Sequence, residues 1–226
     1  DPCKVLAGWG GAGAFSDGKL TLSSEVGGWL NQYMSNKDLE QLVNYADSIY
    51  LKYGAPDHVY GGNAEEIEEI DRKASLAGLK LVRQRIRHMG TERCAETLKK
   101  MRQELNGKIE FKPKSDVKGL IVKNNVVEGV ETLDGDKFFG KYVIAAPGRS
   151  GAEWLQTEAQ AMGLKTLNNP VDIGVRVEVL ASVMEEMTSV LYEPKLVYYS
   201  KSFDDQVRTF CVAPHGEVIT ESYDGV

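Results

Sequence analysis

The hydrophobic pattern of the chain changes from a helical to a strand-like period about halfway along its length. Between positions 36 and 105, apolar residues recur every three or four positions, which is typical of amphipathic helices. The pattern predicts helices over 36–53, 64–77 and 91–106, each followed by a glycine. Ser35 or Asn36 can cap the first helix and Asn63 the second, because their side chains accept hydrogen bonds from free amide groups.

From Gly107 onwards, apolar and polar residues alternate, which indicates β-strands. Strands are predicted over 109–111, 117–123, 126–132, 141–146, 173–177, 196–199, 207–212 and 217–221. Asn124-Asn125 is expected to form a tight turn, and a helix is expected between Ser150 and Gly163. A helical first block and a strand-rich second block predict the fold class α+β. The 226 residues are enough for one large domain or two small ones.

Three arginines alternate in the segment 79–88, which is predicted to be extended. Side chains of an extended segment alternate between two sides, so Arg83, Arg85 and Arg87 are expected on one side and His88 on the other. Their guanidinium groups could bind a carboxylate or a phosphate, including the 2′-phosphate of NADPH. Acidic residues of the preceding helix could neutralise them instead: Glu65, Glu66, Glu68 and Glu69.

A glycine-rich run near the start of the chain is the most informative candidate for ligand binding. Gly8, Gly10 and Gly13 have the spacing of a dinucleotide-binding fingerprint, which requires a helix directly afterwards. The glycines and serines that follow disfavour a helix, so residues 8–20 are predicted to form an irregular loop or a short strand and turn. Such a backbone could approach an anionic or planar ligand. A true Rossmann unit and a mobile loop without a ligand are the alternatives.

Composition excludes several classes of partner. The formal net charge is −6, which argues against a general nucleic-acid surface. No apolar run approaches the roughly 20 residues that span a bilayer, so no membrane partner is expected. The three cysteines are far apart and the three histidines lack metal-ligand spacing, so neither a disulfide scaffold nor a metal site is predicted. A reducing cytoplasm is the expected compartment, and Cys211 is expected to be a buried small hydrophobic residue.

Four ordered stretches resemble a family of bacterial and archaeal FAD-dependent dehydrogenases of the glutathione-reductase-like group, which has two dinucleotide-binding folds. They are residues Gly10–Leu20, Arg87–Thr91, Ala145–Trp154 and Val171–Glu178. The resemblance implies an α/β parent fold with a substrate domain inserted into the FAD domain. It also implies that an N-terminal βαβ unit and a closing C-terminal segment are missing, so this chain is expected to be a middle portion that binds FAD weakly.

The resemblance implies a division of the chain into four parts. They are a flavin-contacting glycine loop (1–30), a helical insert (31–107), an adenine-side meander with its helix (108–165) and a substrate-side strand region (166–226). The residues that it places at FAD are Gly10, Gly11, Ala12, Gly13, Ser16, Asp17, Gly18, Lys19, Val117, Ala146, Pro147, Gly148, Arg149 and Ser150. Near Val117 the backbone would meet the adenine. Flavin-mediated electron transfer to or from a small-molecule substrate is implied, with NAD(P)H as a hydride donor.

Several of these residues also have ordinary structural interpretations. Lys19 could be a solvated surface lysine, and Ser150 could only cap the helix that follows it. Arg87, His88 and Arg176 are candidates for substrate contact, yet Arg176 is expected on a strand where Asp172 or Glu178 could pair with it. A second functional hypothesis is a non-catalytic ligand-binding or interaction module that keeps the flavoprotein fold.

Overall fold

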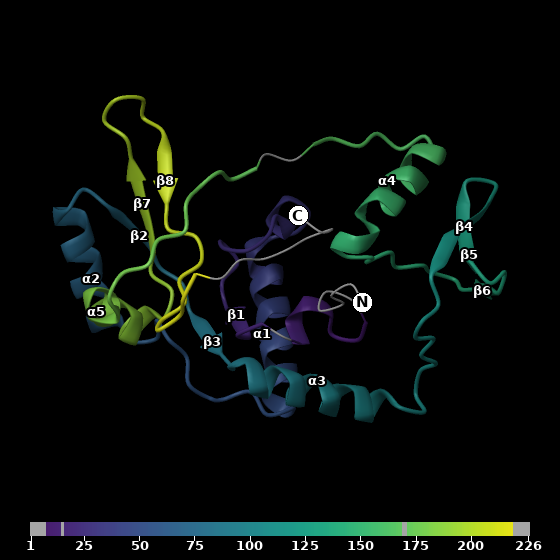
Figure 1. The fold of residues 1–226 in the computed structure, drawn as a ribbon, viewed down its shortest axis with the longest axis horizontal. Helices are drawn as coiled ribbons and strands as arrows, with labels where there is room; N and C mark the ends of the chain where they lie inside the picture. Colours follow the sequence, from purple (N-terminus) through teal and green to yellow (C-terminus); the bar gives the residue numbers. More distant parts are fainter. Residues whose placement is uncertain (1–7, 15, 169–170, 219–226) are drawn as a thin grey trace. The chain divides into compact units, whose positions relative to one another are not determined.

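The computed structural model describes residues 8–14, 16–168 and 171–218, and it divides the chain into two compact units (Figure 1). The first unit comprises residues 1–15 and 102–173, and the second comprises residues 16–101 and 174–226. Both units contain helices and antiparallel strands. The structure therefore confirms the mixed α+β class.

The three helices predicted from the apolar period form where they were expected. They are α1 (Asn36–Lys52), α2 (Ala64–Leu76) and α3 (Thr91–Leu105). Ser35 caps α1 by accepting a hydrogen bond from the amide of Asp38 at 3.2 Å. Asn63 caps α2 by accepting one from the amide of Glu65 at 3.1 Å. Both predicted caps are confirmed.

Two small antiparallel sheets lie in the second unit. One pairs β1 (Lys19–Thr21) with β3 (Ile86–His88). The other has the strand order β2-β7-β8, formed by Lys80–Val82, Lys195–Tyr199 and Gln206–Arg208. The segment 79–88 is thus extended at both ends, as predicted, but residues 83–85 leave one sheet for the other. This break changes the directions in which its arginines point.

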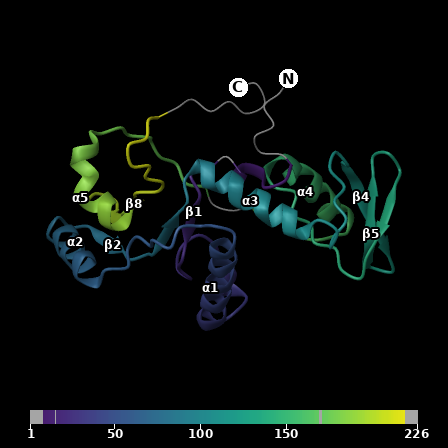
Figure 2. The ribbon, with the colours of Figure 1, turned by 90° about the horizontal axis from the view of Figure 1, so that it is seen from below.

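The core of the second unit joins α2, β2 and a helix, α5 (Ala181–Leu191), which lies beside α2 (Figures 1 and 2). Its buried members are Ile67, Ile70, Ala74, Leu81 and Leu191. The apolar pattern predicted mainly strands in this part of the chain, so α5 was not expected. The signal was present, because Met184, Met187 and Leu191 follow a helical spacing.

A three-stranded meander forms the sheet of the first unit, in the order β4-β5-β6. Its strands are Val117–Lys123, Val126–Thr132 and Lys137–Phe139. Asn124 and Asn125 connect the first two with φ values of 51° and 61°, which is the conformation of a tight hairpin turn. The predicted turn is confirmed. In β5, a Cβ at Gly129 would lie 2.1 Å from the carbonyl oxygen of Phe138, so this close strand approach requires glycine.

Helix α4 (Ala152–Ala161) lies beside β4, which is an edge strand of this sheet (Figure 2). Two of its side chains bind the backbone of β4. The carboxylate of Glu158 accepts a hydrogen bond from the amide of Leu120 at 2.7 Å. The indole of Trp154 donates one to the carbonyl of Lys118 at 3.1 Å. These contacts satisfy backbone groups that an edge strand would otherwise leave open for another chain.

Several strands predicted from the apolar pattern do not form. Residues 141–146 and 173–177 are irregular, and Ile144 and Ile173 are 91% and 95% exposed. Residues 109–111 contribute only an isolated bridge between Asn106 and Ile109, and the strand expected over 207–212 is reduced to β8. A strand requires a neighbour that accepts and donates its hydrogen bonds, and none of the described residues supplies one here. Residues 219–221 of the last predicted strand lie outside the described part, and 217–218 are irregular.

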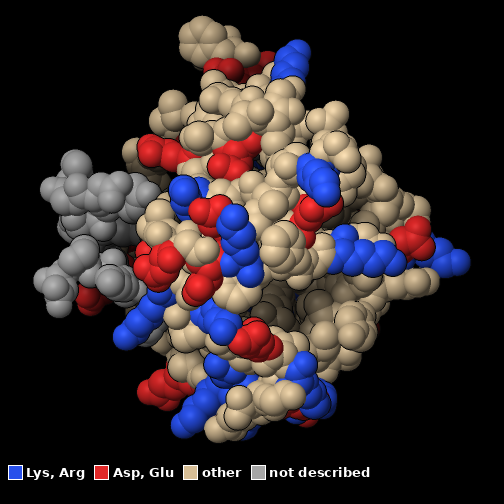
Figure 3. Space-filling model, turned by 90° about the vertical axis from the view of Figure 1, so that its right-hand side faces the viewer, with Lys and Arg blue, Asp and Glu red and all other residues tan. Residues whose placement is uncertain are grey.

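Helix length and surface charge bear on possible membrane and nucleic-acid partners. No described helix is long and apolar enough to cross a bilayer. On the face shown in Figure 3, the described basic side chains are interspersed with acidic ones, and they form no single-sign patch. This distribution agrees with the net charge of −6.

Candidate functional site

The opening glycine run forms an irregular turn with an accessible backbone. Gly8, Gly10 and Gly11 have φ values of 84°, 83° and 49°, and the amide of Gly11 donates to the carbonyl of Gly8 at 3.1 Å. Only a four-residue 3₁₀ turn, η1 (Gly11–Ala14), follows. The predicted absence of a strand–loop–helix unit is confirmed for the described residues. A Cβ at Gly8 or Gly13 would meet no atom within 4 Å.

Gly18 belongs to the packing of the second unit. Its φ is 71°, and a Cβ at this position would lie 2.2 Å from the Sγ of Cys94 and 2.9 Å from the Cβ of Met89. The amides of Met89 and Gly90 donate to the carbonyls of Gly18 and Asp17 at 3.0 and 2.8 Å. The glycine is therefore needed for close contact with the start of α3.

Lys19 is enclosed in an ion pair, which the interpretation as a solvated lysine did not anticipate. Its ammonium group lies 2.5 Å from the carboxylate of Glu193 and 3.8 Å from that of Asp17. The side chains of Lys19 and Glu193 are only 18% and 10% exposed. Burial lowers the pKa of Lys19, but the hydrogen bond and charge of Glu193, with the charge of Asp17, outweigh it and raise that pKa above its ordinary value.

Lys195 is a second, more distant cation at Glu193. Its ammonium group is 3.8 Å from the other carboxylate oxygen of Glu193, and Lys195 is buried. Glu193 thus holds two lysines from two different strands, β1 and β7. This arrangement fixes the charged side chains that border His88, since Lys19 is the register partner of His88 in the β1–β3 sheet.

His88 and Tyr192 form the only described contact between an imidazole and a phenol hydroxyl. The Nε2 atom of His88 lies 2.7 Å from the Oη of Tyr192, and the two rings stack with centroids 4.2 Å apart. Burial lowers the pKa of His88, and it raises the pKa of Tyr192 to about 12. At neutral pH the imidazole is therefore uncharged and the phenol keeps its proton.

Tyr192 occupies a strained backbone position. Its φ and ψ are 58° and −59°, and the amide of Glu193 donates to the carbonyl of Leu191 at 2.7 Å across it. This is a γ-turn with positive φ, a conformation that is rare for a residue with a side chain. The turn aims Tyr192 at His88 while Glu193 reaches Lys19. Neither residue was predicted from the sequence, because no glycine marks the turn.

The three alternating arginines have three different environments, which contradicts their predicted placement on one side. Arg87 is 4% exposed, and it donates to both carboxylate oxygens of Asp47 at 2.6 and 2.7 Å and to the carbonyl of Pro56. Arg83 pairs with Asp71 at 2.8 Å. Arg85 forms no ion pair with any described residue. Neutralisation comes from two aspartates rather than from the glutamates that were predicted.

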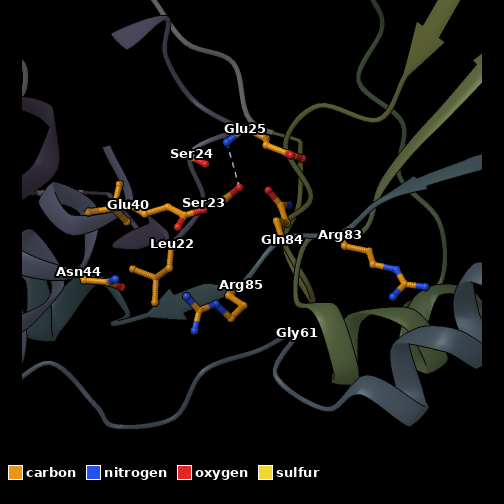
Figure 4. A pocket seen from close by; sticks show the side chains of 11 residues that line it. Leu22, Ser23, Ser24, Glu25, Glu40, Asn44, Gly61, Arg83, Gln84 and Arg85 are labelled. Atoms are coloured by element: carbon orange, nitrogen blue, oxygen red, sulfur yellow. Dashed lines mark hydrogen bonds between the residues drawn. The ribbon is translucent and has the colours of Figure 1, made fainter. Parts of the chain in front are cut away.

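A cavity of about 300 Å³ lies between the segment after β1, the side of α1 and the link from β2 to β3 (Figure 4). All of these belong to the second unit. Gln84 connects the cavity with the ion-pair network, because its Nε2 donates to the carbonyl of Glu193 at 3.0 Å. Its Oε1 is buried and has no hydrogen-bond partner among the described residues. No pattern in the sequence indicates a role for Gln84.

The second predicted cofactor stretch lies in the first unit. Residues 142–147 are irregular, Gly148 has a φ of 68°, and a Cβ there would meet no atom within 4 Å. Arg149 begins a short 3₁₀ turn, η3 (Arg149–Gly151). The cap of α4 is Gly151 without a side-chain hydrogen bond, so the predicted capping by Ser150 is wrong. Val117, at the start of β4, pairs with Thr132.

Figures 1 and 2 both draw the start of α4 close to the η1 turn, within the first unit. Ala146 and Pro147 precede α4, and Gly10–Gly13 form the turn. The side chain of Ser16 and the carboxylate of Asp17 belong to the second unit, where Ser16 accepts a hydrogen bond from the amide of Gly18 at 3.1 Å. The predicted cofactor residues are thus divided between the two units.

Arg176 and Cys211 were both expected on strands that do not form there, and the expected burial of Cys211 is wrong. Arg176 is exposed in an irregular segment and forms no ion pair with the described residues, while Glu178 accepts a hydrogen bond from the amide of Val218. Cys211 is exposed, whereas Cys94 is buried. Within the described part of the chain, no cluster of His, Cys, Asp and Glu could hold a metal ion.

No protein-family model, no curated protein and no solved structure matches the chain.

Proposed function

We propose that this chain is part of an FAD-dependent oxidoreductase that transfers electrons between a small-molecule substrate and a nicotinamide donor. The proposal starts from the four ordered stretches that resemble FAD-dependent dehydrogenases. Its parent fold would be an α/β FAD-binding fold with an inserted substrate domain. The observation that carries it furthest is the accessible backbone of the opening glycine run.

Two stretches of the first unit fit a planar or anionic cofactor. Gly8 and Gly13 in the opening turn, and Gly148 before α4, leave open space where any other residue would have a Cβ. Backbone amides without nearby side chains can approach a phosphate or a ring closely. We therefore assign FAD contacts to Gly10–Gly13 and to Ala146–Ser150.

Gly18 and Lys19 have internal partners that account for them without a ligand. Cys94 and Met89 occupy the space in which a Cβ at Gly18 would lie, and the carboxylate of Glu193 neutralises the ammonium group of Lys19. A lysine in this ion pair is not free to neutralise a pyrophosphate unless Glu193 is displaced. We assign both residues to the packing of the β1–β3 sheet within the second unit.

Bound FAD would supply the electron transfer of the proposed reaction. Within the second unit, His88 and Tyr192 form a hydrogen-bonded pair that could hold or move a proton, independently of the FAD contacts assigned to the first unit. The uncharged imidazole can accept a proton, and the phenol hydroxyl can donate a hydrogen bond over the 2.7 Å between Nε2 and Oη. The γ-turn at Tyr192 and the stacking of the two rings hold these atoms in place.

A non-catalytic ligand-binding module is the second candidate. It is favoured by the ion pair of Lys19 with Glu193, because this pair neutralises the cation of the stretch that resembles the flavin loop. The two candidates differ in their redox behaviour. Only the oxidoreductase would pass electrons from NADH or NADPH to the flavin.

The test uses a glycine substitution that the fold tolerates. Gly13→Val places a side chain where no atom lies within 4 Å, and Gly28→Val is a matched control with equally open surroundings and no positive φ. The protein is mixed with FAD and then with NADH or NADPH, and the loss of oxidised-flavin absorbance is followed. We expect the nucleotide to reduce the flavin. Gly13→Val should slow this flavin reduction, and Gly28→Val should leave its rate unchanged. Flavin binding without reduction by either nucleotide would support the non-catalytic module.

A further inference from the structure

The cavity beside Gln84 contains a buried acceptor that no described residue uses. Gln84 is 5% exposed, and the hydrogen bond from its Nε2 to the carbonyl of Glu193 fixes the orientation of its carboxamide. The Oε1 atom is covered by surrounding atoms, and Gln84 is one of the residues that line the cavity. Figure 4 shows the carboxamide end pointing toward Ser23. A buried carbonyl without a hydrogen-bond donor is unfavourable, so a ligand that donates a hydrogen bond here would be favoured.

Three charged residues around the cavity are also without ion-pair partners in the described chain. Arg85 contributes a guanidinium group, and Glu25 and Glu40 contribute carboxylates. Arg83 differs from Arg85 in that it pairs with Asp71 and points away from the cavity in Figure 4. Charges of both signs are thus available to a ligand.

The remaining lining defines the size and polarity of the ligand. Leu22 and Val43 offer a small apolar surface, while Ser23, Ser24 and Asn44 offer hydroxyl and amide groups. A volume of about 300 Å³ lies at the lower end of the range for small-molecule sites. The ligand must therefore be a small molecule that has an anionic group, a hydrogen-bond donor group and only a short apolar part.

We propose that this cavity binds a small zwitterionic amino acid. Its carboxylate would pair with Arg85, in the two-pronged geometry that a guanidinium group favours. Its ammonium group would donate to the Oε1 of Gln84 and face the carboxylates of Glu25 and Glu40. A short aliphatic side chain would contact Leu22 and Val43. This site is independent of the proposed flavin contacts, which lie in the other unit.

Calorimetric titration with L-valine tests the proposal. L-valinamide, which lacks the carboxylate, and 2-hydroxy-3-methylbutyrate, which lacks the ammonium group, are the matched analogues. We expect valine to bind at least about 10-fold more tightly than either analogue, since each lost charged contact removes about 1.4 kcal/mol or more. Equal binding of all three compounds, or no heat of binding for valine, would overturn it.

Two exposed arginines provide a matched pair of variants. Arg85→Gln should weaken valine binding about 10-fold, whereas Arg83→Gln should change it less than about 2-fold. Both side chains are exposed, so neither change threatens the fold. An equal loss in the two variants would contradict the assignment of Arg85. Gln84→Met, checked for folding by circular dichroism, should also weaken binding because it removes the Oε1 acceptor.

Discussion

Tyr192 places its hydroxyl oxygen 2.7 Å from the Nε2 of His88 although the two residues are 104 positions apart in the sequence. His88 ends β3, and Tyr192 follows α5 in a γ-turn. The next residue, Glu193, pairs with Lys19, which is the register partner of His88. One strained turn therefore connects the ion pair and the hydrogen-bonded ring pair of the second unit.

The lowered pKa of His88 predicts an acid-sensitive contribution to stability. Its folded pKa lies below the ordinary value of 6.5, so the unfolded chain binds the proton more readily. The contribution is complete above pH 6.5 and is lost as the pH falls toward the folded pKa. The ring is partly exposed, so the slope should stay well below the limit of about 1.4 kcal/mol per pH unit for one proton.

The measurement is chemical denaturation between about pH 7.5 and 5.5, above the main titration of the carboxylates. His88→Gln keeps a hydrogen-bonding group but cannot titrate, so its free energy of unfolding should vary less with pH than that of the unmodified protein. Asp17 and Lys19 are the charged groups that also affect His88. An unchanged slope in His88→Gln would contradict the prediction.

Lys19 and Glu193 should be coupled energetically. Lys19→Met leaves a poorly exposed carboxylate without its nearest cation, and Glu193→Gln leaves the ammonium group with the more distant Asp17. We expect a coupling energy of about 1–3 kcal/mol from a double-mutant cycle of unfolding free energies. The exposed pair of Lys100 and Glu96, 2.9 Å apart on α3, is the control. Its coupling should be close to zero, and equal couplings would contradict the role of burial.

Substitutions at Gly18 and Gly78 separate two causes of lost stability, which are backbone strain and steric contact of the new side chain. Their φ values are 71° and 74°, but only at Gly18 would a Cβ meet other atoms. Gly78→Ala should cost about 1 kcal/mol, from the left-handed conformation alone. Gly18→Ala should cost about 2–4 kcal/mol, because Cys94 and Met89 must also move. Thermal and denaturant unfolding measure both values, and equal losses would show that the Cys94 contact does not constrain this position.

Local signals in the sequence were sufficient for elements that depend on neighbouring residues. Ser35 and Asn63 cap their helices as predicted, and Asn124-Asn125 forms the predicted turn, because these residue types hydrogen-bond locally or tolerate positive φ. The apolar run 141–146 was predicted as a strand but is irregular. The alternating pattern shows that this segment could form a β-strand. Whether it does depends on a second strand, distant in the sequence, that hydrogen-bonds with it.

The candidate site was predicted only in part for the same reason. His88 and Lys19 attracted attention through the motifs that contain them, but their partners Tyr192 and Glu193 come from the far end of the chain. Arg87 was a candidate for substrate contact because an extended segment was expected to place three arginines on one side, whereas its partner Asp47 lies on α1. Long-range pairs of this kind have no periodic signal in a single sequence.

Binding of FAD is the most direct test of the proposed function. Flavin fluorescence is followed while the protein is titrated with FAD. We predict saturable binding with a dissociation constant of about 1–100 μM, since the glycine turn and the segment before α4 supply only part of the contacts expected of an FAD fold. Gly13→Val should weaken this binding and Gly28→Val should not. No saturable change up to about 1 mM FAD would contradict the account, and a nanomolar constant would contradict the expectation of weak binding.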